Sequence, residues 1–265
     1  MFKETFGSHN PIVAMIHLPP LPGTPLYDAK GGMQKIIESA AKDIEALQGG
    51  GVDAMMFGNE GDRPYVLKAS PVTLAAFACV VGELRRMIKV PFGVNYLWDP
   101  VASVALGVAS GARFVREIFT GVYDSDMGLW VPDSAGALKL RADAHRKDMK
   151  LMFNINAEFA SPVGTRTIAQ RAKSAVFASL ADVVLVSGPM TGEAVALSNL
   201  KEAKQAVPNT PVFANTGVNI ENVEEILSIG DGAIVGTHFK VDGNTWNAVD
   251  GTRVKRFMQK VDKLR

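Results

Sequence analysis

Three glutamates stand close after apolar segments of the chain: Glu60, Glu117 and Glu158. Carboxylates are costly to bury without partners, so each is a candidate general acid, general base or metal ligand. Crowding two carboxylates raises the pKa of one of them, which then holds a proton near neutral pH. The three residues therefore indicate proton-transfer catalysis, or a shared divalent metal that polarises a carbonyl. The alternative is that they form salt bridges at the rim of the fold.

Polar side chains that could orient the hydroxyl and carbonyl groups of a substrate follow similar segments. They are His17, Asn59, Asn95, Arg116 and Asn154. Arg116 directly precedes Glu117, and side chains alternate along a strand, so we expect these two to point to opposite faces. One of them would then only hold a helix against the sheet. His17 opens a proline-rich segment that could equally serve as a rigid lid.

Small residues and glycines follow three later apolar segments. The candidates for binding a phosphate are Ser187, Gly188, Asn215, Thr216, Gly217, Gly236 and Thr237. Glycine lets backbone N–H groups approach an anion closely, and loops after the last two strands of many barrels bind phosphate in this way. The alternative is that they are ordinary turns between strands and helices. The sequence assigns no cofactor, and a divalent metal is possible.

Eight short apolar, β-branched segments recur along the chain and predict strands. They are Ile12–Ile16, Val52–Phe57, Phe92–Val94, Arg113–Val115, Leu151–Ile155, Val183–Val186, Val212–Ala214 and Ala233–Val235. Successive segments begin 21 to 40 residues apart, which is too far for hairpins and long enough for helical crossovers. We therefore expect parallel strands.

The segments between the strands have the apolar periodicity of helices. The predicted helices are Met33–Gln48, Thr73–Ile88, Pro100–Ala109, Ser134–Lys147, Thr167–Leu180, Thr191–Val207, Ile220–Ile229 and Asp250–Leu264, with Asn219 as the N-cap of the seventh. Eight strands, each followed by a helix, predict an α/β fold: one (β/α)8 TIM barrel domain over residues 1–265. An open doubly wound sheet is the alternative, but the first strand leads into His17–Gly23 instead of a glycine-rich dinucleotide turn.

Composition narrows the classes of partner. The net charge is +1, from 28 Lys and Arg against 27 Asp and Glu, which argues against nucleic acid as the main partner. The longest uncharged apolar stretch, Ala69–Gly82, is too short to span a membrane. The single cysteine, Cys79, fits a reducing cytoplasm, and its apolar neighbours predict that it is buried and inert. The formation of a homo-oligomer stays open.

Strings over nearly the whole chain resemble the BtpA/SgcQ family, and the SgcQ branch in particular. They are Met15–Gly23, Gly50–Ala54, Asn59-Glu60, Asp62–Tyr65, Gly93–Asn95, Trp98–Pro100, Phe114–Gly121, Ser187-Gly188, Ala214–Val218 and Asn222–Glu225. The resemblance implies a barrel of the ribulose-phosphate-binding type. Members from photosynthetic organisms are linked to photosystem I biogenesis, and the SgcQ branch is associated with genes for sugar uptake and sugar phosphates.

Two positions depart from the pattern of the photosynthetic members. Gly61 stands in place of an Asn, and Glu158-Phe159 stands where a Lys-His pair is expected. We therefore expect a cytoplasmic enzyme that isomerises, epimerises or cleaves a phosphorylated sugar or a similar small compound. A Schiff-base aldolase is disfavoured because no lysine stands at a predicted strand end. The alternatives are a non-catalytic assembly factor and a metabolite-binding sensor.

Overall fold

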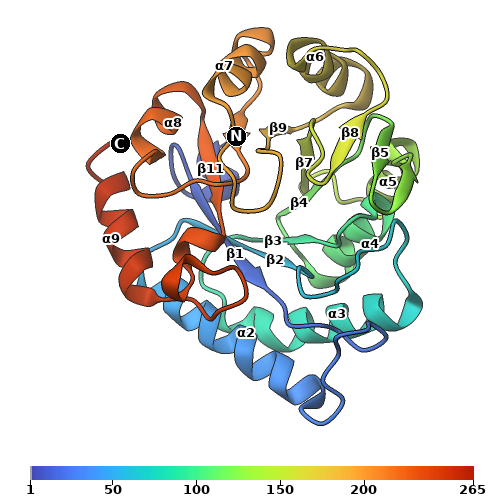
Figure 1. Cartoon of the computed structure of the whole chain (residues 1–265), viewed down its shortest axis with the longest axis vertical. Helices are drawn as coiled ribbons and strands as arrows, with labels where there is room; N and C mark the ends of the chain where they lie inside the picture. Colours follow the sequence, from blue (N-terminus) through green and yellow to red (C-terminus); the bar gives the residue numbers. More distant parts are fainter. Residues whose placement is uncertain (1) are drawn as a thin grey trace.

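Eight parallel strands close into a barrel in the computed structural model, which describes residues 2–265 (Figure 1). They are β1 (Ile12–His17), β2 (Ala54–Gly58), β3 (Phe92–Asn95), β4 (Phe114–Glu117), β7 (Lys150–Asn154), β9 (Val183–Val186), β10 (Val212–Ala214) and β11 (Gly232–Val235). Around the ring the order is β1-β11-β10-β9-β7-β4-β3-β2. Each strand overlaps a predicted segment, so the TIM-barrel prediction is confirmed.

Helices surround the barrel (Figure 1). They are α2 (Gly32–Gly49), α3 (Pro71–Leu84), α4 (Pro100–Ser110), α5 (Ser134–Asp143), α6 (Ile168–Ser179), α7 (Leu197–Ala206), α8 (Val223–Ile229) and α9 (Gly251–Val261), with short 3₁₀ turns η1 (Arg85–Met87), η2 (Thr237–Phe239) and η3 (Val241–Gly243). A further short helix, α1 (Phe2–Phe6), lies at the amino-terminal end of the barrel. Local signals fix several starts. Asp99 accepts hydrogen bonds from the N–H groups of Val101 and Ala102, which caps α4.

Several helices are shorter than predicted, and three of them show a local cause. α5 ends at Asp143, and His145 adopts a left-handed backbone with φ 55°. α7 begins at Leu197, because the residues after β9 form a loop that serves the site described below. α8 begins at Val223, because the side chain of Asn219 accepts the N–H groups of Glu221 and Asn222 and so forms a turn ahead of the helix.

A small antiparallel sheet was not predicted. Its strands are β5 (Tyr123–Ser125), β6 (Gly128–Trp130) and β8 (Ala160–Pro162), in the order β6-β5-β8. Strands of three residues are too short to show an alternating pattern. The sheet packs Tyr123 and Trp130 against Trp98, with the Trp98 and Trp130 ring centroids 5.1 Å apart. It therefore holds Trp98 in place at the end of the barrel.

The core has two layers. One fills the space between strands and helices, and the other fills the inside of the barrel. Phe6 belongs to the inner layer, and its ring lies 5.1 Å from that of Phe114 and 5.7 Å from that of Phe213. Because Phe114 begins β4, Phe6 closes the amino-terminal end of the barrel, and the opposite end is left for chemistry.

A loop over residues 240–249 follows the last strand. At its base, Asp43 of α2 accepts hydrogen bonds from Lys240 Nζ at 2.7 Å and from Val249 N at 2.8 Å. Further along, the hydroxyls of Thr245 and Thr237 lie 2.8 Å apart, and the Trp246 ring lies 3.6 Å from the Arg63 guanidinium carbon. The loop is therefore attached both to a helix and to the loop after β2.

Two expectations about the surface were tested by the structure. Cys79 is exposed on α3, so the prediction that it is buried is wrong; Phe77 and Val80 of the same helix face the core instead. Among the helices of residues 2–265, none has the length and apolar character needed to cross a membrane.

Candidate active site

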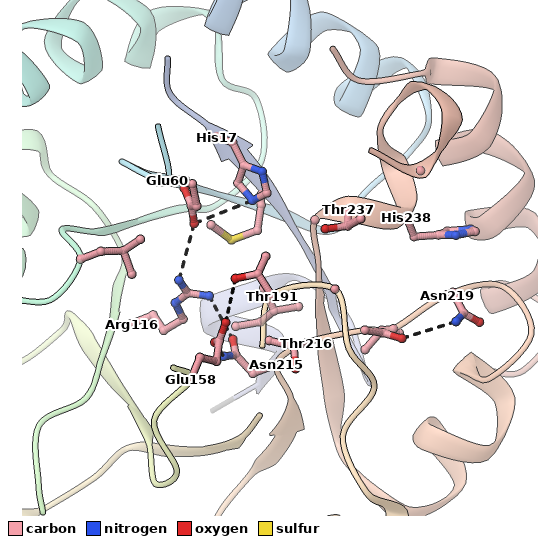
Figure 2. Close-up of a pocket in the computed structure, with 18 of the residues that line it drawn as sticks. His17, Glu60, Arg116, Glu158, Thr191, Asn215, Thr216, Asn219, Thr237 and His238 are labelled. Carbon is pink, nitrogen blue, oxygen red and sulfur yellow. Dashed lines mark hydrogen bonds and ion pairs between the residues drawn. The ribbon is translucent and has the colours of Figure 1, made fainter. Parts of the chain in front are cut away.

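A cavity of about 210 Å³ lies at the carboxyl ends of the strands (Figure 2). Many predicted site residues line it: His17, Glu60, Arg116, Glu158, Asn215, Thr216, Gly217, Gly236 and Thr237. Met15 and Ile234, from the inner core layer, also border it. The fold therefore brings residues from all eight barrel strands or the loops after them to one place, as TIM barrels do.

Arg116 occupies the centre of the polar side of this cavity. It is only 8% exposed, and its guanidinium donates to Asn95 Oδ1 from Nε at 3.0 Å and also from Nη2. Its Nη1 donates to Asn215 Oδ1 at 3.1 Å. Figure 2 shows Arg116 between the carboxylates of Glu60 and Glu158. A cation held in this way can stabilise negative charge that develops on a bound ligand.

Glu60 is a buried carboxyl group that lies at a distance from its charged neighbours. Its Oε1 lies 3.7 Å from Arg116 Nη2 and 3.8 Å from His17 Nε2, and its Oε2 has no hydrogen-bond partner within residues 2–265. Burial raises the pKa of Glu60 to about 7, although the charge of Arg116 opposes the shift. Glu60 can therefore hold or release a proton near neutral pH.

Glu158 is also buried but is better supplied with donors. Its Oε2 accepts from Thr191 Oγ1 at 3.0 Å, and its Oε1 accepts from Asn215 Nδ2 at 3.2 Å and Ser187 Oγ at 3.4 Å. Burial raises the pKa of Glu158, and Arg116 and the two hydroxyl groups oppose this shift. Hydrogen bonds to a carboxylate favour its charged form, so Glu158 is the better placed of the two to act as a base.

His17 separates the carboxylates from the turn after β11. Burial, and then the positive charges of Lys240 and Arg116, hold the pKa of His17 well below its ordinary value, so the ring is neutral. A Cβ at Gly236 would lie 2.9 Å from His17 Cε1, which shows how closely the turn approaches the ring. A neutral imidazole can donate and accept one hydrogen bond each toward a ligand.

The other side of the cavity is formed by the turns after β10 and β11. Gly217 adopts a φ of +63°, and a Cβ there would lie 2.2 Å from the backbone N of Ala194. Asn222 Nδ2 donates to the carbonyl of Gly217 at 2.9 Å. A larger residue at position 217 would therefore displace the neighbouring backbone, so it is unsuitable as a test of anion binding.

Sequence reasoning missed Arg253, which lines the cavity beside these turns. Its Nε donates to the carbonyl of His238 at 2.8 Å, and its Nη2 lies 3.5 Å from the position of a Cβ at Gly243. Arg253 lies in the first turn of α9, and the search for site residues covered only strand ends. Trp98 and Tyr65 follow the ends of β3 and β2 and were missed because only polar side chains were taken as candidates there. The indole Nε1 of Trp98 is buried without a hydrogen-bond partner in the described chain.

Other predicted residues lie behind the cavity wall. Asn59 connects the loops after β2 and β3, since it donates a hydrogen bond to Asp62 and accepts one from the N–H of Leu97. Asn154 Nδ2 donates to Ser187 Oγ at 2.7 Å, and Gly188 N donates to Thr216 Oγ1 at 2.5 Å. These residues hold the groups that line the cavity, as does Asn95.

Glu117 also lies outside the cavity. Arg116 lines the cavity and Glu117 does not, as their alternation along β4 predicts. Glu117 Oε2 accepts a hydrogen bond from Asn95 Nδ2 at 2.8 Å. Within residues 2–265 it has no ion pair, and its Oε1 has no hydrogen-bond partner. Burial raises the pKa of Glu117 well above its ordinary value.

Comparison with known proteins shows the family and the fold of the chain. The model of the BtpA family matches residues 8–263. The chain belongs to the BtpA family. The sgc region protein SgcQ of Escherichia coli (strain K12) is 48% identical over 263 residues, which cover 99% of this chain and 98% of the relative. The photosystem I biogenesis protein BtpA of Synechocystis is 31% identical over 260 residues, covering 97% and 89% of the two chains.

Solved structures share the fold of this BtpA-family chain. Phosphoribosyl anthranilate isomerase from Thermus thermophilus superimposes with a TM-score of 0.57 over 96% of this chain and all of the other. At 12% sequence identity the likeness shows the fold alone.

Gly61 is packed closely against the loop after β1. A Cβ at Gly61 would lie 2.6 Å from both the carbonyl oxygen of Leu18 and the nitrogen of Pro20. The loop after β1 therefore packs directly on the backbone of Gly61, and an asparagine would require the loop to move. The glycine at position 61 therefore allows the loop that follows His17 to take its observed position.

The residues described in this BtpA-family chain contain no group of three His, Cys, Asp or Glu side chains that could together hold a metal ion.

Proposed function

We propose that the chain is an enzyme that transfers protons on a small phosphorylated compound, a sugar phosphate by class. The reaction is an isomerisation, an epimerisation or a retro-aldol cleavage. The observation that carries the proposal is the pair of buried carboxylates, Glu60 and Glu158, on the two sides of Arg116 in a cavity at the carboxyl ends of a TIM barrel. Such a pair fits an acid and a base that act on one ligand.

In an isomerisation, Glu158 takes a proton from the carbon next to the carbonyl group of the substrate. The electron pair of the broken C–H bond forms a carbon–carbon double bond, and the carbonyl oxygen takes up the displaced pair. Glu60 donates its proton to that oxygen, and Arg116 stabilises the negative charge that develops there. In isomerisation the neighbouring carbon takes the proton held by Glu158, while the second hydroxyl of the enediol gives its proton to the Glu60 carboxylate and becomes the new carbonyl. In epimerisation the enol returns its proton to Glu60, solvent protonates the opposite face of the same carbon, and Glu158 releases its proton to solvent.

The phosphate would bind at the turns after β10 and β11. Gly217, Gly236 and Thr237 present backbone there, and Arg253 adds a positive charge. Because Gly236 touches His17 and His17 lies next to Glu60, a short carbon chain is enough to reach from these turns to the carboxylates. This assignment rests on the residues of the cavity.

Exchange of substrate protons with solvent deuterium tests the proposal directly. The protein is incubated in D2O with a panel of three- to six-carbon sugar phosphates, and carbon-bound deuterium is measured by proton NMR and mass spectrometry. We expect at least one compound to gain deuterium with the parent protein. An absence of exchange across a panel that includes compounds shown to bind would overturn the proposed reaction class.

Arg253→Gln is expected to weaken the binding of inorganic phosphate and phosphate esters about tenfold, because a charged hydrogen-bond donor is lost. The matched control is Arg256→Gln, an exposed arginine three residues further along α9 that does not line the cavity. A thermal-shift assay measures phosphate binding by both variants, because a ligand that binds only the folded state raises the melting temperature of the protein. Equal phosphate binding by the two variants would place the anion elsewhere.

An assembly role is the second candidate, favoured by one observation. Leu129, Val131 and Val163 are each at least 60% exposed on or next to the small antiparallel sheet, and Val122 is 40% exposed beside them. Apolar side chains that gather on a surface are typical of interaction sites. The Synechocystis relative is named for photosystem I biogenesis. A metabolite sensor would bind its ligand in the same cavity without turnover, and deuterium exchange distinguishes such a sensor from an enzyme.

A further inference from the structure

We propose that Glu117 is a positioning residue that orients the Asn95 amide and, through it, holds Arg116 in the cavity. The inference rests on the proposed function, because Arg116 matters for catalysis only if the cavity is the active site. Glu117 was predicted from the sequence as a catalytic candidate, and the structure places it behind the cavity wall. It therefore acts through another residue.

The contacts form a continuous chain from Glu117 to the cavity. Asn95 Nδ2 donates one hydrogen bond to Glu117 Oε2 at 2.8 Å and another to the carbonyl oxygen of Arg116 at 2.9 Å. Asn95 Oδ1 accepts from Arg116 Nε at 3.0 Å and from Nη2. The same guanidinium then reaches Asn215 Oδ1 at 3.1 Å and lies 3.7 Å from Glu60 Oε1.

The hydrogen-bonding pattern determines which way the Asn95 amide faces. An amide NH2 group has two hydrogens to donate, and here both go to acceptors on β4. The amide oxygen is thereby left facing the Arg116 guanidinium, which has only donors. If the amide rotated by half a turn, its NH2 group would face the guanidinium and donors would oppose donors. Glu117 therefore contributes one of the two acceptors that prevent this rotation.

The surroundings of Glu117 suit an uncharged acid. The residue is 2% exposed, and no cationic side chain pairs with it in the part of the chain that the structure describes. Burial raises its pKa well above the ordinary value, although the charge of Arg116 and the hydrogen bond from Asn95 oppose the shift, and the net effect favours the protonated form. A glutamine has the same shape as a protonated glutamic acid and can offer the same acceptor to Asn95. A leucine has a similar size and offers none.

The pKa of Glu60 reports on the position of the Arg116 guanidinium, and it can be measured without any substrate. The Arg116 charge lowers the pKa of Glu60, and the other groups that act on it are His17, Glu158 and Lys240. The protein is labelled with carboxyl ¹³C-glutamate and titrated by NMR, with the Glu60 signal assigned by its loss in Glu60→Gln. Arg116→Gln provides the reference for complete loss of the cation, with an upward shift of the midpoint of about one pH unit.

We expect Glu117→Leu to move the Glu60 midpoint upward by about half a pH unit and Glu117→Gln to leave it near that of the parent. Asn95→Ala should shift the midpoint at least as far as Glu117→Leu does. If Glu117 acts only through Asn95, the double variant Asn95→Ala, Glu117→Leu shifts the Glu60 midpoint no further than Asn95→Ala alone. Folding of each variant is checked by circular dichroism.

Two results would overturn the inference: a parental Glu60 midpoint in Glu117→Leu, or equal shifts in Glu117→Leu and Glu117→Gln. Its failure differs from failure of the proposed function. If the parent exchanges no substrate protons while Glu117→Leu still shifts the Glu60 midpoint, the positioning role stands and the proposed reaction fails. If exchange occurs and the midpoint does not move, the reverse holds.

Discussion

Glu60→Gln is expected to lower the turnover number by about 10²-fold or more, because an amide cannot give up a proton to the carbonyl oxygen of the substrate. Glu158→Gln should produce a loss of similar size, since it removes the group that takes the proton from carbon. The measurement is deuterium exchange or turnover with the compound that the panel identifies. Glu83→Gln, an exposed glutamate on α3, is the matched control.

The dependence on pH gives the same prediction a second readout. Because the pKa of Glu60 is about 7, the protonated acid is lost above neutral pH, and kcat/KM should fall along an alkaline limb that begins there. The stability of the fold also depends on whether Glu60 is protonated. The folded carboxyl binds its proton more tightly than the unfolded one, whose pKa is near 4.5, so the free energy of unfolding falls as the pH rises between these two values. Glu60→Gln should remove both effects.

Near-parental turnover in both Glu60→Gln and Glu158→Gln would remove these residues from the mechanism. An alkaline limb that persists in Glu60→Gln would assign that limb to another group. Either result would leave the two carboxylates as partners of Arg116 with a structural role.

Asp43→Leu is expected to lower the free energy of unfolding by about 3–5 kcal/mol, because it leaves the charge of Lys240 buried without a partner. The two side chains are 6% and 2% exposed and meet at 2.7 Å. Asp43 also accepts the N–H of Val249, so its loss should cost more than Lys240→Met. Urea denaturation measures both variants.

The double variant Asp43→Leu, Lys240→Met should recover most of the loss, since it removes both charges together. Asp143→Ala serves as the control, because it breaks the exposed pair with Lys139, which is also 2.7 Å long, and should change stability by about 0.5 kcal/mol or less. A small effect of Asp43→Leu, equal to that of Asp143→Ala, would contradict the assignment of a buried pair.

The strands of the barrel could be predicted because parallel strands are covered on both faces and therefore read as continuous apolar segments. The site followed from their positions, since polar residues after such segments must meet at one end of the barrel. Because Arg116 and Glu117 are adjacent on a strand, their alternation predicted that only one of them faces the cavity. In each case the deciding property is local and leaves a mark in the sequence.

Other features depend on contacts between distant segments. Arg253 reaches the cavity from a helix after the last strand, and no local pattern distinguishes it from the exposed Arg256. The late start of α7 is similar: Thr191 bonds Glu158, and Ala194 packs on Gly217, so the loop after β9 is shaped by the neighbouring strand ends. Helical propensity alone cannot report such constraints.

The contact between Trp246 and Arg63 equips the chain with an optical reporter. Trp246 is 52% exposed, whereas Trp98 and Trp130 are 3% and 2% exposed, so a water-soluble quencher such as acrylamide reaches mainly the indole on the 240–249 loop. The loop also bonds Thr237, at the turn proposed to bind phosphate. A change in fluorescence quenching when phosphate is added would therefore report on the loop at the mouth of the cavity, in a protein with no introduced dye.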